Sequence, residues 1–91
     1  IMGAKKIAVR NGIGKVTNAT VAAISKDYDL AILELEKPYS KKYSINAKDF
    51  VTPQAGDDVI SIGYPDIGIT FKVDKVFVQT PGPDAGKLIN G

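Results

Sequence analysis

The sequence contains neither cysteine nor histidine, and these two absences exclude a large part of protein chemistry. Without cysteine there can be no disulfide, no thiolate nucleophile and no cysteine metal ligand. Without histidine the chain lacks the side chain that most often acts as a general base near neutral pH, and also the commonest metal ligand. Acidic pairs such as Asp57-Asp58 have no EF-hand spacing. We therefore expect neither a cofactor nor a metal site.

Long apolar runs are also missing, so no segment predicts a membrane span. The first ten residues, IMGAKKIAVR, lack the long apolar region of a secretory signal peptide. They begin with Ile rather than Met, so we expect the chain to be part of something longer. Neither sign of charge predominates, because the chain has 12 Lys and Arg and 10 Asp and Glu. The basic residues form no stripe with interleaved aromatics, so we expect no nucleic-acid partner.

The 91 residues suit one small domain, and a hydrophobic content of 44% is too high for a disordered chain. Short runs of alternating apolar and polar residues recur along the chain and predict strands. These runs are KKIAVR (5–10), KVTNATVAAIS (15–25), LAILELE (30–36), VISIGYP (59–65) and ITFKVDKVFVQ (69–79). No helical periodicity of useful length accompanies them.

Turn residues separate the expected strands. Asn11-Gly12 predicts a hairpin, because both residue types tolerate positive φ. Residues 26–29 (KDYD), Gly56 and residues 66–68 (DIG) predict further turns. Residues 38–50 are expected to form a polar loop, and the Pro- and Gly-rich residues 80–91 a loop or tail.

Two runs have a less regular pattern. Residues 30–36 are partly apolar on both faces, which favours a central strand, and Pro38 is expected to end it. Residues 69–79 change phase near Asp74-Lys75, which predicts a bulge or bend. Taken together, the runs predict an all-β fold, and we favour a small antiparallel β-barrel because closure removes exposed strand edges.

Two motifs follow one another in the sequence: Asp29-Leu30-Ala31-Ile32-Leu33, and GDDVISIGYP at residues 56–65. Together they resemble the HtrA-like branch of the trypsin-like serine proteases. The likeness covers most of residues 5–79. It implies that residues 1–91 form one partial protease domain, made of the first barrel of a chymotrypsin-like double barrel and the first strand of the second. It also implies a periplasmic or secreted protein and a peptide or protein substrate.

The resemblance implies that Asp29 is the acid of a Ser-His-Asp triad. Such an acid has to be held rigidly and partly buried, so that it can orient a histidine and stabilise the imidazolium. A position at the mouth of a strand suits that requirement. The residues alone favour Asp29 as a turn former, and Asp27 competes for either role.

The chain departs from the protease pattern in two essential places. It contains no histidine, and none of its serines stands in a Gly-x-Ser-Gly context: Ser25, Ser40, Ser44 and Ser61. The family places its histidine upstream of the strand that residues 5–10 resemble, and its nucleophile beyond the strand that residues 69–79 resemble. We therefore expect this chain to be inactive alone.

Two other interpretations remain open from the sequence. One is a non-catalytic β-barrel binding module that keeps the protease scaffold, which the missing histidine favours. The other is an unrelated small β-domain such as an oligonucleotide-binding barrel, whose sign would be exposed aromatics with basic neighbours on one sheet face. A partial barrel would also leave strand edges open, and we expect such edges to allow oligomers.

Overall fold

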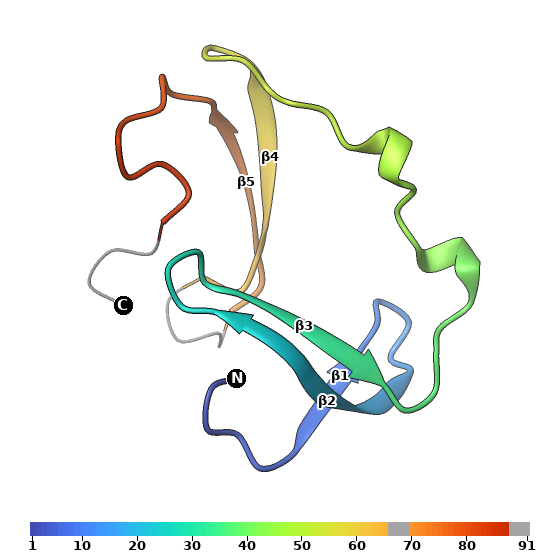
Figure 1. Cartoon of the computed structure of the whole chain (residues 1–91). Coiled ribbons are helices and arrows are strands. Elements are labelled where there is room, and N and C mark those ends of the chain that lie inside the picture. The colour runs from blue at the N-terminus through green and yellow to red at the C-terminus, as the bar shows by residue number, and fades with distance from the viewer. Residues whose placement is uncertain (66–69, 88–91) are drawn as a thin grey trace. The chain divides into compact units, whose positions relative to one another are not determined.

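The fold is an arrangement of antiparallel strands (Figure 1) in a computed structural model that describes residues 1–65 and 70–87. In these residues the elements are β1 (Ile7–Arg10), β2 (Val16–Ser25), β3 (Leu30–Leu35), the 3-10 turns η1 (Lys41–Tyr43) and η2 (Ala47–Asp49), β4 (Asp58–Gly63) and β5 (Lys72–Phe77). The prediction of an antiparallel, strand-rich chain is confirmed. The strands of the described residues form two open sheets and no closed barrel.

The chain divides into two compact units, and each is described by itself. The first contains Ile1–Ile45 together with Gly86 and Lys87, and the second is Asn46–Ala85. The three-stranded sheet β1-β2-β3 belongs to the first unit and the two-stranded sheet β4-β5 to the second. The turn expected at residues 66–68 lies outside the described residues.

The first sheet has one continuous, half-buried face. Its register places Val9 opposite Thr17 and Val21 opposite Leu33. Residues directly opposite in an antiparallel pair share a face, so these side chains lie on the same side of the sheet. The expectation that residues 30–36 form a central strand is wrong for the described residues, because β3 pairs only with β2 and lies at an edge. Its second apolar face is therefore uncovered, with Leu30 67% and Ile32 65% exposed.

The five residues 11–15 connect β1 to β2, and the predicted hairpin is confirmed. Positive φ falls at Gly14 (+84°) and not at the Asn11-Gly12 pair. The Gly14 N–H donates to the Asn11 carbonyl, and the Asn11 N–H donates to the Lys15 carbonyl, each at 3.0 Å. This is a turn closed by a glycine bulge. The Asn11 side chain supports the loop by accepting from the Lys15 N–H at 2.9 Å.

Two side chains attach the segment after β3 to the β1-β2 hairpin. The Tyr39 hydroxyl lies 2.9 Å from both the Val9 and the Lys15 carbonyl oxygens. A phenol carries a single proton, so its donation is shared between the two carbonyls. Thr17 is a buried residue, only 7% exposed, and its hydroxyl accepts from the Lys37 N–H at 3.1 Å. The strand thus ends before Pro38, as predicted.

The second sheet begins at a glycine bulge. Gly56 has φ +92°, its N–H donates to the Val78 carbonyl, and the Val78 N–H donates to the Asp57 carbonyl. The turn predicted at Gly56 is therefore confirmed. The bulge predicted at Asp74-Lys75 is wrong, because the β4-β5 register runs through these residues without a shift. Both faces of this sheet are exposed, so an apolar residue on either face needs no compensating kink. The irregularity lies instead in β2, between Val21 and Ala23.

Burial is shallow throughout the described residues. None of their hydrophobic side chains is fully buried, and Thr17 is the single buried polar residue. Large apolar side chains are exposed on both sheets, Ile24 and Leu30 on the first and Ile60 and Phe77 on the second. Backbone pairing and local turns thus carry most of the order in each unit.

Gly14 and Gly12 form a matched pair for testing the loop. A Cβ would meet no atom within 4 Å at either position, but only Gly14 has a positive φ. We expect Gly14→Ala to lower the free energy of unfolding of the first unit by about 1 kcal/mol, because an L-residue is strained there. Gly12→Ala should leave this free energy unchanged or raise it slightly. Amide hydrogen exchange in β2 would measure both, and equal effects of the two variants would contradict this account of the loop.

Removing the Tyr39 hydroxyl tests the attachment of the segment after β3. We expect Tyr39→Phe to lower the free energy of unfolding by about 1 kcal/mol, since the ring stays while the shared hydrogen bond is lost. Tyr43→Phe is the control, because the Tyr43 ring lies edge-on to Tyr39 at 6.5 Å and its hydroxyl contributes no such bond to the hairpin. Hydrogen exchange of the Val9 and Lys15 region would separate the two variants, and an unchanged rate in Tyr39→Phe would refute the role of the hydroxyl.

Candidate functional site

Asp29 occupies the last position of the turn between β2 and β3. The turn covers residues 26–29, and Leu30 begins β3 immediately after it. Asp29 has φ +55°, the left-handed region that non-glycine residues enter rarely. Asp and Asn are the side chains that tolerate this region best, which is one reason for an aspartate at this point of the chain. The conformation fixes the direction in which the Cα–Cβ bond leaves the turn.

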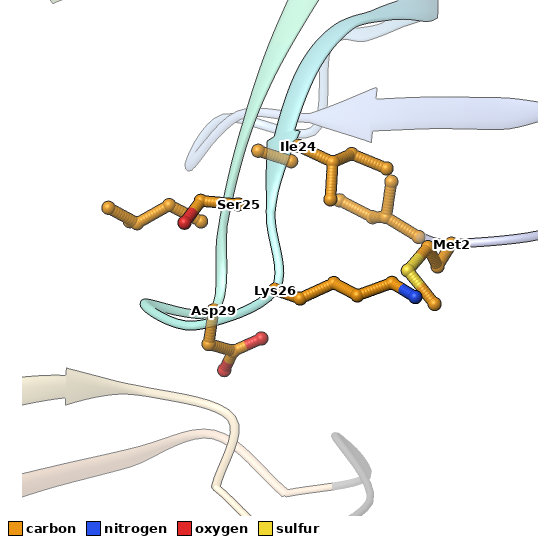
Figure 2. A pocket seen from close by; sticks show the side chains of 8 residues that line it. Met2, Ile24, Ser25, Lys26 and Asp29 are labelled. Carbon is orange, nitrogen blue, oxygen red and sulfur yellow. The ribbon is translucent and has the colours of Figure 1, made fainter. Parts of the chain in front are cut away.

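A shallow hollow of about 380 Å³ lies beside this turn. Its walls come from the N-terminal residues Ile1 and Met2, from the end of β2 and from the start of β3. Figure 2 shows the Lys26 side chain extending towards Met2 and not towards the Asp29 carboxylate. The hollow is thus an apolar surface with one basic and one acidic group at its rim.

The Asp29 carboxylate is exposed. An acid that orients a histidine works from a partly buried position, where its charge is not screened by water. The turn places the carboxylate directly before β3 but leaves it exposed. The chain contains no histidine, so a histidine partner for this carboxylate would lie outside the 91 residues.

The serines are not arranged as nucleophiles. Ser25 lines the hollow at the end of β2, but its side chain and that of the adjacent Lys26 extend to different sides of the strand (Figure 2). Ser40 caps η1, where its hydroxyl accepts from the Lys42 N–H. Ser61 lies within β4. None of these positions brings a hydroxyl next to a base, which nucleophilic catalysis by serine requires.

In residues 1–65 and 70–87 no group of three or more acidic side chains is placed to hold a metal ion. Asp27, Asp29, Asp57 and Asp58 are all exposed in turns or at a strand end. No helix within these ranges has the length and apolar character needed to cross a membrane.

Comparison with known proteins returns no match of any of three kinds. No protein-family model matches the chain. The same is true of curated protein sequences and of solved structures. The protease interpretation of Asp29 therefore stands on the two sequence motifs and on the local geometry of the turn.

Sequence reasoning pointed to Asp29 but missed the backbone conformation that presents it and the hollow beside it. The left-handed conformation could have been suspected, since an aspartate that ends a four-residue turn before a strand is a frequent occupant of that region. The contribution of Ile1 and Met2 to the hollow had no sequence signal, because it depends on where the N-terminal turn folds back.

Asp29→Gly separates backbone strain from carboxylate chemistry. We expect this variant to keep or raise the free energy of unfolding of the first unit, by up to about 1 kcal/mol, because glycine adopts φ +55° without a Cβ clash. Asp27→Gly, in the same turn but outside the left-handed region, should lower it. Hydrogen exchange of β2 and β3 measures both, and a clear loss of protection in Asp29→Gly would show that the side chain itself holds the turn.

Proposed function

We propose that this chain is part of a trypsin-like serine endopeptidase, in which Asp29 is the acid of a Ser-His-Asp triad. The observation that carries the proposal is the placement of Asp29. It ends a tight turn, stands directly before β3 and projects an exposed carboxylate from a fixed left-handed backbone. The motifs at residues 29–33 and 56–65 support it, and each now lies on a strand or on the turn that precedes one.

The histidine and the serine of this triad would come from residues outside the 91. The histidine would take the proton of the serine hydroxyl and return it to the leaving amine. Asp29 would accept a hydrogen bond from the other ring nitrogen, which selects the tautomer and stabilises the imidazolium. The substrate would be a peptide or protein, and the chain by itself would catalyse no hydrolysis.

We also propose that the two sheets are parts of a chymotrypsin-like barrel pair completed by further strands. The support is the amount of apolar surface that the described residues leave uncovered, at Leu30 and Ile32 on the first sheet and Ile60 and Ile62 on the second. Additional strands would remove this apolar surface from water.

The alternative function is a non-catalytic binding module on the same scaffold. The missing histidine and nucleophile favour it, and so do the open strand edges, which can accept an extended peptide by backbone pairing. It differs from the protease proposal in one measurable respect: no serine in the protein would react with an active-site label.

The test uses the protein encoded by the complete open reading frame that contains these residues. We expect a fluorophosphonate probe to label it and casein to be cleaved, whereas the 91-residue chain does neither. Asp29→Asn should lower kcat by about 10⁴-fold, because the histidine loses its correct tautomer. Asp27→Asn is the matched control from the same turn and should retain activity. An open reading frame without a histidine and a Gly-x-Ser-Gly segment, or full activity in Asp29→Asn, would exclude the protease proposal.

A further inference from the structure

The strand β5 has one edge occupied by β4 and one edge that is open in the described residues. Every residue from Lys72 to Phe77 is exposed. An open edge presents unpaired N–H and C=O groups that can pair with another strand. A two-stranded sheet is also marginally stable in water and gains most from added strands.

The backbone groups that face the open edge can be assigned. Val78 exchanges hydrogen bonds with the β4 side of the sheet, through Gly56 and Asp57. Residues along an antiparallel strand alternate between its two neighbours. The even-numbered residues of β5 therefore bond towards β4, and Val73, Lys75 and Phe77 direct their N–H and C=O groups to the open edge.

The charged side chains of β5 favour one register of antiparallel self-pairing over the adjacent registers. A second copy can be placed beside β5 by a two-fold axis normal to the sheet. The two β5 strands then run antiparallel, and the residue at the axis lies opposite the same residue of the other copy. Centring at 72, 74 or 75 places Lys72, Asp74 or Lys75 opposite its own copy, and like charges directly opposite are destabilising. Centring at 76 pairs no opposite charges.

Centring at Val73 gives a different result. Val73 then lies opposite the Val73 of the second copy, and Lys72 lies opposite Asp74 on both sides of the axis. These ion pairs fall at positions without mutual backbone hydrogen bonds, where cross-strand side chains approach most closely. Phe71 lies opposite Lys75, whose apolar stem can cover part of the ring.

The same register joins two apolar surfaces. Ile62 pairs with Val73 and shares a face with Ile60 and Phe77. The Tyr64 and Phe71 rings lie 5.3 Å apart. Because the two-fold axis is normal to the sheet, this face of one copy continues into the same face of the other.

We infer that β5 is a self-association edge, and that a second copy of this chain pairs with it antiparallel, with Val73 on the two-fold axis and Lys72 opposite Asp74. The occupant is a second copy because the charges of β5 are complementary to their own sequence in this register. The inference does not depend on Asp29 or on any protease activity.

Charge exchange tests the pairing in the full 91-residue chain, with sedimentation equilibrium as the measurement. The parent chain should form dimers that weaken at high salt, since the ion pairs are exposed. Asp74→Lys and Lys72→Asp should each weaken self-association by about tenfold to a hundredfold, because each turns both ion pairs into repulsions. An equimolar mixture of these two variants should form a heterodimer, and the double variant should again form a homodimer.

Matched controls come from η2 in the same unit. Asp49→Lys and Lys48→Asp change the net charge by the same amounts at exposed positions outside β5, and should leave self-association unchanged. The inference is overturned by a parent chain that stays monomeric, by single variants that associate as tightly as the parent, or by a mixture that fails to associate. If a single variant does not fold, the double variant decides, because its charges are again complementary.

The register itself can be read with single cysteines, since the chain has none of its own. In the proposed dimer, Val73→Cys places two cysteines directly opposite at a spacing that a disulfide can bridge. Lys75→Cys lies on the same edge, but its copies are separated by about 13 Å along the strand. Rapid oxidative cross-linking of Val73→Cys and slow cross-linking of Lys75→Cys are expected. The reverse order would exclude the register.

Discussion

Antiparallel backbone pairing is the constraint on which the rest of this structure depends. Among residues 1–65 and 70–87 no hydrophobic side chain is fully buried, so packing cannot fix the position of one strand against another. Register is set instead by local devices, namely the glycine bulges at Gly14 and Gly56. The Tyr39 hydroxyl and the Thr17 hydroxyl add the contacts that are distant in sequence. A small chain buries little of its surface, and here such devices replace part of a core.

The candidate site inherits its geometry from one of these pairings. β2 and β3 are joined by residues 26–29, and Asp29 takes the left-handed conformation at the end of that turn. The carboxylate is exposed at this position. Such a placement suits the role that we propose for it, in which it orients a histidine supplied by residues outside the 91.

Open edges and uncovered apolar faces are the other consequence of a structure held by pairing. Proteins often protect an edge strand with charged side chains, especially lysine, or with prolines or bulges. β5 carries Lys72, Asp74 and Lys75, which alternate in sign and leave one self-pairing register favourable. The same exposed surface is consistent with a partial barrel and with a strand that recruits its own copy.

The local pattern of the sequence determined the strands, their antiparallel class and most of the turns. The alternation of apolar and polar residues was sufficient to predict the strands, and Asn11 and Gly56 were sufficient to predict two of the turns. Both signals depend only on residues that are close in the sequence. Tertiary structure decided the rest: the edge position of β3, the bulge in β2 rather than in β5, and the attachment of Tyr39 to Val9 and Lys15. Each of these depends on which strand or segment lies alongside another. The residues of a single strand do not determine which segment lies beside it, because the sequence pattern of an apolar face is the same whether that face is covered or exposed to water.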